Sequence, residues 1–145
     1  MAAVGLFNVG RDVSLSLVRP GGQLLKPVNM TDFKFRQITV DLKSRPVSGP
    51  PLHAYLPDGW EGSMVYDRSD SVLDNYLATL ESNFYSSLGL EQLTITETVR
   101  EVNGSISQYR FDNVAVRLED GGSWKADSTV AITLGWMAST RTRVA

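Results

Sequence analysis

Few side chains in this sequence could form a catalytic or metal-binding centre. Cysteine is absent, and the single histidine is His53. Without cysteine the chain has no thiolate nucleophile, no disulfide and no thiolate ligand for a metal. His53 could join only carboxylates at a metal site, and no Asp or Glu lies close to it in the sequence. We therefore expect His53 to be an ordinary loop or interface residue.

Motifs of known chemistry are equally scarce. No serine stands in a Gly-x-Ser-x-Gly elbow, and the glycines at 5–10 and 21–22 lack the lysine and following helix of a phosphate-binding loop. Asp67, Asp70 and Asp74 do not follow EF-hand spacing, whereas Asp70 and Asp74 suit the start of a helix. The sequence predicts no catalytic residue, no cofactor and no metal, and therefore no enzyme.

The three tryptophans leave one alternative open, a stacking platform for sugars. Trp136 alternates with apolar neighbours, which predicts a core position. Trp60 and Trp124 lie beside turns and remain candidates for such a platform. A β-sandwich carbohydrate-binding module is therefore kept as an alternative.

Size and charge indicate one ordinary folded domain over residues 1–145. Hydrophobic residues make up 42% and charged residues 21%, and the net charge is −2. The fourteen Lys and Arg are scattered, so the chain lacks the basic cluster of a nucleic-acid binder. No apolar run reaches the roughly 20 residues of a membrane helix, and no basic leader precedes the first apolar residues. We expect no membrane association and retention in the cell that makes the protein.

Alternating apolar residues predict a mainly β fold, an antiparallel sandwich or barrel of about seven or eight strands. Clear runs occur at residues 13–17, 60–66, 114–118 and 129–139. Between Met30 and Leu42 the alternation changes phase near Arg36 and Gln37, which predicts a bulge or bend.

Asn103-Gly104 lies between two strand-like runs and predicts a β-hairpin. With a two-residue turn, Glu97 would lie directly across from Arg110, although a bulged loop would shift this register. Neither face of the hairpin is cleanly apolar, so we expect it to have no obvious solvent side.

A single helix is predicted at about residues 71–88, flanking the sheet. Its apolar stripe comprises Val72, Leu73, Tyr76, Leu77, Leu80 and Phe84. Asp70 or Ser71 is predicted to cap its start and Gly89 to end it. A stripe of this kind must be buried, so we expect the helix to cover one face of the sheet.

The segment 44–59 contains four of the six prolines and cannot be a central strand. Because it also carries apolar residues, we predict a projecting loop that becomes ordered against a partner. Residues 1–10 are small and punctuated by glycine, which predicts an extended N-terminal arm.

Three parts of the chain, besides the helix, carry a resemblance to a known family. They are Val9-Gly10-Arg11-Asp12-Val13-Ser14-Leu15, Pro57-Asp58-Gly59-Trp60-Glu61-Gly62-Ser63, and Ile95-Thr96-Glu97-Thr98 with the hairpin that ends in Gln108-Tyr109-Arg110-Phe111. In the order of its segments and their residue types, the chain resembles bacteriophage tail tube proteins, whose fold is shared with the inner tube of type VI secretion systems. The resemblance covers nearly the whole chain.

This resemblance implies a structural role in the virion. Such proteins form hexameric rings that stack into a tube for genome ejection, after assembly in the host cytoplasm. The implied partners are further copies of the chain, sheath, baseplate and terminator proteins, and double-stranded DNA that passes through the lumen without sequence-specific binding. A terminator, a baseplate ring or a secretion tube is the alternative within related folds.

By position, the segment 44–59 resembles the loop that joins one ring to the next. The contact candidates are Arg45, Pro46, Val47, Pro50, Pro51, Leu52, His53 and Tyr55. Glu97 and Glu101 are candidates for side chains that face an acidic lumen. The N-terminal arm and the C-terminal tail are further candidates for contacts between rings.

Overall fold

The computed structural model describes residues 6–26 and 29–144. Within these ranges the chain forms eight antiparallel strands, one short 3-10 helix and one α-helix, so the predicted mainly β class is confirmed. The strands are β1 (Val13–Val18), β2 (Leu24–Leu25), β3 (Met30–Ser44), β4 (Leu52–Asp67), β5 (Leu93–Arg100), β6 (Ile106–Asp120), β7 (Ala131–Ala138) and β8 (Thr140–Arg143). The helices are η1 (Gly10–Asp12) and α1 (Val72–Tyr85). Most of the predicted N-terminal arm, residues 1–5, lies outside the described residues.

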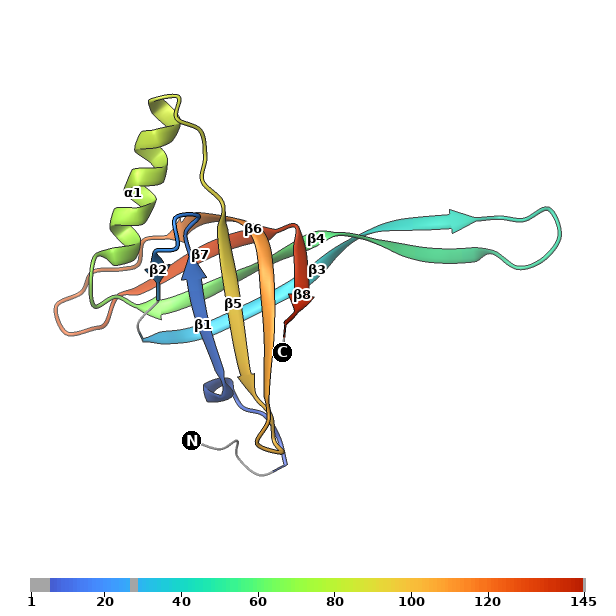
Figure 1. The fold of residues 1–145 in the computed structure, drawn as a ribbon, viewed down its shortest axis with the longest axis horizontal. Helices are drawn as coiled ribbons and strands as arrows, with labels where there is room; N and C mark the ends of the chain where they lie inside the picture. Colours follow the sequence, from blue (N-terminus) through green and yellow to red (C-terminus); the bar gives the residue numbers. More distant parts are fainter. Residues whose placement is uncertain (1–5, 27–28, 145) are drawn as a thin grey trace.

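The strands form one continuous sheet that folds into two crossing layers (Figure 1). The strand order is β2-β1-β5-β6-β7-β4-β3, with β8 paired to β6. β6 belongs to both layers, because its first half pairs with β5 and β8 and its second half with β7. At the bend Asn113 has a φ of 54°, a conformation that asparagine tolerates better than most residues. The bend in β6 therefore joins the two layers covalently.

Aromatic rings fill the space between the two layers. Phe111 lies 4.8 Å from Trp136 and 5.4 Å from Phe35, measured between ring centroids. The rings of Phe33 and Trp60 extend this cluster. These large apolar side chains supply much of the burial that stabilises the fold.

The helix covers less of the sheet than the sequence predicts. Leu73 and Tyr76, in its first turns, are buried, whereas Phe84 near its end is 57% exposed. In Figure 1 α1 rises away from the strands and a descending segment returns to β5. The expectation that the helix shields a sheet face is therefore wrong for its second half, because the helix runs beyond the edge of the sheet.

Both ends of α1 have identifiable caps. The Asp70 carboxylate accepts a hydrogen bond from the Val72 N–H at 3.2 Å, as predicted. The prediction that Gly89 ends the helix is wrong. The left-handed residue that ends it is Ser87, with a φ of 62°. The Leu88 N–H donates to the Asn83 carbonyl at 2.9 Å, which completes a Schellman end.

The β5–β6 hairpin is confirmed, but its predicted register is wrong by one residue. The Glu101 N–H donates to the Ser105 carbonyl, and the Gly104 N–H donates to the Glu101 carbonyl. This is a three-residue loop with Gly104 at φ 91°, not a two-residue turn. Glu97 consequently pairs with Tyr109, and Arg110 pairs with Thr96 on the opposite face.

Candidate functional site

A two-stranded ribbon projects from the body of the molecule, on the side opposite α1 (Figure 1). β3 and β4 pair out to Ser44 and Leu52, whereas β7 pairs with β4 only over residues 60–67. The predicted loop 44–59 is therefore a loop only at the tip, residues 45–51, and a strand from Leu52 onward. Pro57 is tolerated because that part of β4 has β3 as its one strand neighbour in the described chain.

A bulge marks the point where the ribbon leaves the body. Gln37 pairs with Trp60 and Thr39 pairs with Pro57, so β4 carries one residue more than β3 between these pairs. Gly59 in this bulge has a φ of 101°, which favours glycine. The register shift predicted near Arg36 and Gln37 is confirmed, with the additional residue on β4.

The ribbon has one apolar and one polar face. Cross-strand pairing places Val40 opposite Leu56, Leu42 opposite Ala54 and Ser44 opposite Leu52. We call Val40, Leu42, Leu52, Ala54 and Leu56 the apolar ribbon face. The opposite face carries Thr39, Asp41, Lys43, His53, Tyr55 and Pro57.

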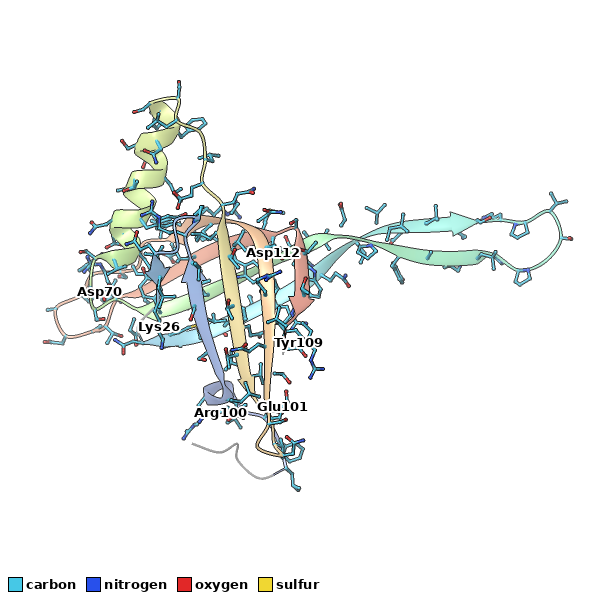
Figure 2. All side chains as sticks on the ribbon, viewed as in Figure 1. Lys26, Asp70, Arg100, Glu101, Tyr109 and Asp112 are labelled. Atoms are coloured by element: carbon cyan, nitrogen blue, oxygen red, sulfur yellow. The ribbon has the colours of Figure 1, made fainter. Side chains whose placement is uncertain are left out.

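The apolar ribbon face is open to solvent. Leu42 is 53% and Leu52 is 59% exposed, and Figure 2 shows the ribbon side chains projecting into open space. A contiguous exposed apolar surface on a soluble protein typically marks an interaction site. A two-stranded ribbon with a free apolar face is also only marginally stable on its own. The ribbon is therefore the main candidate for an assembly contact.

The contact residues predicted from the sequence divide between three places. Arg45, Pro46, Val47, Pro50 and Pro51 lie in the tip. Leu52 lies on the apolar ribbon face, whereas His53 and Tyr55 lie on the polar face.

Sequence reasoning missed Val40, Leu42 and Leu56 as candidate contact residues. Their alternation was visible in the sequence, but only strand pairing shows that they share one exposed face.

Neither acidic residue predicted to face a lumen forms an open acidic surface. Glu97 is 4% exposed and points between the layers, because it shares one face of β5 with the buried Leu93 and Ile95. The chain already buries this carboxylate before any partner binds, and a lumen-facing role for Glu97 stays a prediction. Glu101 lies at the hairpin turn and is half-buried (Figure 2).

Glu97 instead pairs with Arg141 of β8 inside an aromatic cage. The Arg141 guanidinium lies 3.0 Å from the Glu97 carboxylate and 3.7 Å from the ring centroid of Tyr109. Phe35 and Trp60, at the root of the ribbon, lie 4.8 and 5.5 Å from the same guanidinium. Arg141 therefore connects the last strand to both layers and to the root of the ribbon.

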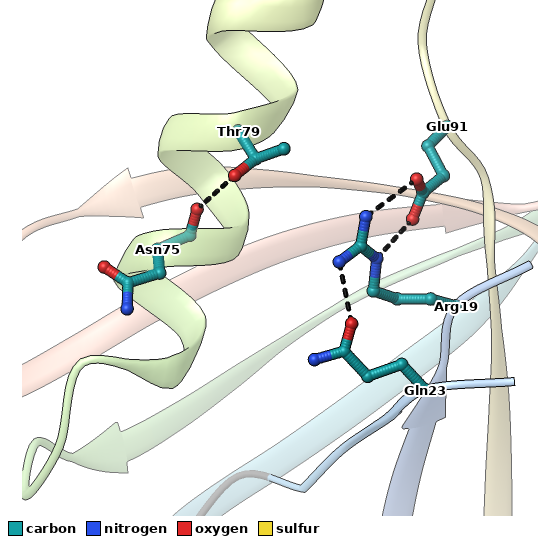
Figure 3. A network of polar contacts seen from close by, with 5 residues as sticks. All are labelled: Arg19, Gln23, Asn75, Thr79 and Glu91. Carbon is teal, nitrogen blue, oxygen red and sulfur yellow. Dashed lines mark hydrogen bonds and ion pairs between the residues drawn. The ribbon is translucent and has the colours of Figure 1, made fainter. Parts of the chain in front are cut away.

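A second polar network holds the segment that follows α1 (Figure 3). The Arg19 Nε lies 2.7 Å from one oxygen of Glu91, and Nη2 lies 3.1 Å from the other. The hydrogen bond from Arg19 lowers the pKa of Glu91. Arg19 Nη1 also donates to the Gln23 side chain at 2.8 Å. The ion pair holds the return segment against the end of β1, and the Arg19 guanidinium also lies 5.1 Å from the ring centroid of Tyr76 in α1.

The second exposed apolar surface lies at the far end of α1. We call Phe84, Tyr85, Leu88 and Leu90 the helix overhang. Tyr85 is 77% exposed, and its ring meets the Phe84 ring edge-on at 5.4 Å between centroids.

Other features give little indication of small-molecule chemistry. A hollow of about 610 Å³ on the outer face of β3, β4, β6 and β7 is bordered by the ion pairs Arg36–Glu61 and Arg117–Glu119. Among the described residues no group of three or more His, Cys, Asp or Glu is placed to hold a metal. No helix in the described part of the chain is long and apolar enough to cross a membrane.

The tryptophans do not combine into a sugar platform. Trp136 is buried, as predicted, and Trp60 is half-buried in the aromatic core. Trp124 is exposed beside Arg68, whose guanidinium lies 5.5 Å from the ring centroid. The three indoles therefore share no open face.

Comparison with solved structures indicates what this arrangement resembles. A chain in the cryo-EM structure of the anti-feeding prophage baseplate superposes with a TM-score of 0.59 at 5% identity, covering 97% of each chain. The chain shares the fold of contractile injection system components. A chain in the sheath/tube terminator of an extracellular contractile injection system, PVC, gives 0.60 at 10% identity, covering 100% of this chain and 99% of that chain.

The sheath–tube complex of the same PVC system also contains a similar chain. Its TM-score is 0.56 at 12% identity, covering 91% of this chain and 88% of that chain. No protein-family model and no curated protein matches the sequence. The predicted resemblance to tail proteins is thus supported at the level of fold, and the specific tube role stays a prediction.

Proposed function

We propose that this protein is a structural, non-enzymatic subunit of a phage-type tail or contractile injection particle. The apolar ribbon face carries the proposal, because a single chain leaves it exposed while an assembly would bury it. Burying one such half-exposed Leu or Val side chain contributes on the order of 1 kcal/mol. Repeated around a ring, contacts of this size make assembly favourable.

Within this class we propose a tube subunit. Hexameric rings would stack through the ribbons into a tube that carries DNA out of the virion, with sheath, baseplate and terminator proteins as partners. The fold match to a chain of a sheath–tube complex and the absence of a basic cluster in the sequence support this role. A channel wall without clustered cations does not hold phosphates strongly.

A terminator or baseplate ring is the second candidate. Chains from a terminator and from a baseplate match this chain over at least 97% of its length. The two roles differ in growth: a tube subunit adds ring upon ring, whereas a terminator or a baseplate ring forms a single layer at the end of a tube.

Electron microscopy of the purified chain tests the proposal. We expect rings at moderate concentration and tubes of variable length when the protein is concentrated. Rings that never stack would favour the terminator or baseplate role. A chain that remains monomeric at all concentrations contradicts the proposal.

Matched ribbon variants test the role of the apolar ribbon face. We expect Leu42→Ser to abolish stacking without lowering the Tm, because Leu42 contacts little within its own chain. Asp41→Ser changes the neighbouring residue on the polar face and should assemble normally. Normal tubes from Leu42→Ser would contradict the assignment of this face.

A further inference from the structure

We propose that the apolar ribbon face of one copy docks against the helix overhang of another copy. This inference rests on the proposed function, because it names the surface that receives the ribbon in the assembly. The two surfaces are large exposed apolar features at opposite ends of the molecule (Figure 1). They cannot meet within one chain.

The helix overhang continues the stripe that attaches α1 to the core. Tyr76 is 4% exposed, Leu77 and Leu80 are half-buried, and Phe84 is 57% exposed. Residues at these spacings share one helix face, so the overhang presents the same apolar stripe without a sheet beneath it. In the first half of α1 the sheet covers this stripe. At the overhang the apolar ribbon face of another copy can take the place of the sheet.

The apolar ribbon face is long enough to span the helical part of the overhang. From Val40 to Ser44 the ribbon extends about 13 Å, at roughly 3.3 Å per residue. Leu77 and Leu80 pack against the core of their own chain, so the exposed part of the stripe lies beyond Leu80. From Leu80 to Tyr85 the helix extends about 8 Å, at 1.5 Å per residue.

Charge at the edges of the two surfaces is complementary. The tip of the ribbon carries Arg45, which is exposed. Residues 72–90 contain no Lys or Arg, and their exposed acidic residue is Glu81, because Asp74 is already paired with Arg68. Approach of the basic ribbon end to the acidic helix is therefore favourable and sets the orientation of docking.

A contact between two different surfaces of identical chains generates closed rings or open stacks. Unless two copies dock reciprocally about a twofold axis, every copy retains one unused ribbon or overhang until the assembly closes, so growth continues past a dimer. A ribbon–overhang contact is thus suited to a subunit whose assembly repeats.

Cysteine cross-linking tests this contact against a clean background, because the chain contains no cysteine. Leu42→Cys and Phe84→Cys are prepared as separate proteins, mixed, assembled and oxidised with copper phenanthroline. We expect the mixture to give at least tenfold more disulfide-linked dimer than either variant alone. The control pair Asp41→Cys and Ser82→Cys carries its thiols on the opposite faces and should cross-link weakly.

A charge exchange provides a second test without cysteine. We expect Arg45→Glu, in the tip, to weaken assembly at least tenfold, measured as the critical concentration for tubes. Mixing it with Glu81→Lys should restore assembly in copies where the two changed surfaces meet. Absence of this rescue, with both variants folded, overturns the pairing.

The outcomes separate this inference from the proposed function. Rings or tubes that form without preferential linkage between positions 42 and 84 overturn the docking contact and leave the function intact. Linkage of Phe84→Cys only to an added sheath protein assigns the overhang to a different partner and also overturns it. A chain that never assembles overturns both.

Discussion

Arg141 has a structural role that its place near the end of the chain does not suggest. Its guanidinium compensates a carboxylate that is almost fully buried and contacts rings from both layers. An ion pair of this kind stabilises little compared with an apolar pair of the same shape. Removing one partner, however, leaves a charge in an apolar surrounding.

Substitution of Arg141 should therefore be costly. We expect Arg141→Met to lower the free energy of unfolding by about 2–4 kcal/mol, because Glu97 remains buried without its partner. Arg141→Lys should lose about 1 kcal/mol, because lysine keeps the charge but cannot stack its head group on the rings. Urea denaturation measures both values.

Arg117→Met is the control for these measurements. It removes an exposed ion pair with Glu119 and should change the free energy of unfolding by less than about 0.5 kcal/mol. Equal effects of Arg141→Met and Arg117→Met would contradict the structural role assigned to Arg141.

Two buried tyrosines predict a loss of stability in alkali. Burial raises the pKa of Tyr66 and of Tyr76 to about 12, from 10.0. Above pH 10 the unfolded chain releases these protons while the folded chain retains them. Stability is therefore unaffected by these groups below pH 10 and falls between pH 10 and pH 12.

Thermal denaturation across this pH range measures the effect. Absorbance at 295 nm should show two phenols that ionise later than the exposed ones. Replacement of both residues by phenylalanine should flatten the decline. An unchanged decline in that variant would assign it to other groups.

At the scale of elements, the close pairing of β3 and β4 depends on Gly62. A Cβ at this position would meet the Lys34 carbonyl and would lie 2.8 Å from the Trp136 ring. We expect Gly62→Ala to lower the free energy of unfolding by about 3 kcal/mol, because neither the backbone of β3 nor the packed ring can move away freely. Gly21→Ala, where a Cβ has open space, is the control for the urea measurement. Similar midpoints for the two variants would contradict this packing argument.

The sequence predicts the strands and the helix better than it predicts what packs against them. Alternation located the strands and the bulge near Gln37, and Asn103-Gly104 located the hairpin, because both signals are local in the sequence. The stripe on α1 identified the face of the helix that packs, but periodicity does not reveal where the sheet beneath it ends. The second half of the helix is exposed for that reason.

The candidate site was predicted only in part. The proline-rich segment pointed to a projection, and Leu52 does lie on its apolar face. Glu97 shares a face of β5 with Leu93 and Ile95, and the sequence does not show that the second layer covers this face. The added residue in the hairpin loop changes only which β6 side chains lie opposite it. The cage around Arg141 could not be predicted, since its members come from two separate hairpins, β3–β4 and β5–β6, which only the fold brings together around β8.

At the scale of the whole molecule, β6 makes the two layers a single unit. Unfolding of either layer would remove the strand partners of one half of β6 and expose the aromatic rings packed between the layers. We therefore expect one cooperative transition, with coincident midpoints for tryptophan fluorescence, which reports on Trp60 and Trp136, and for far-ultraviolet circular dichroism. Separate midpoints would show that the layers are independent.

The ribbon can also be considered as a mechanical lever. Its six paired residues beyond the bulge place the tip roughly 20 Å from its pivot. A tilt of about 10° at the pivot would move the tip by roughly 3–4 Å, about the rise of one residue along a strand. The position of the tip relative to a neighbouring molecule therefore depends on how rigid the pivot is. There the rings of Phe35 and Trp60 pack against Arg141.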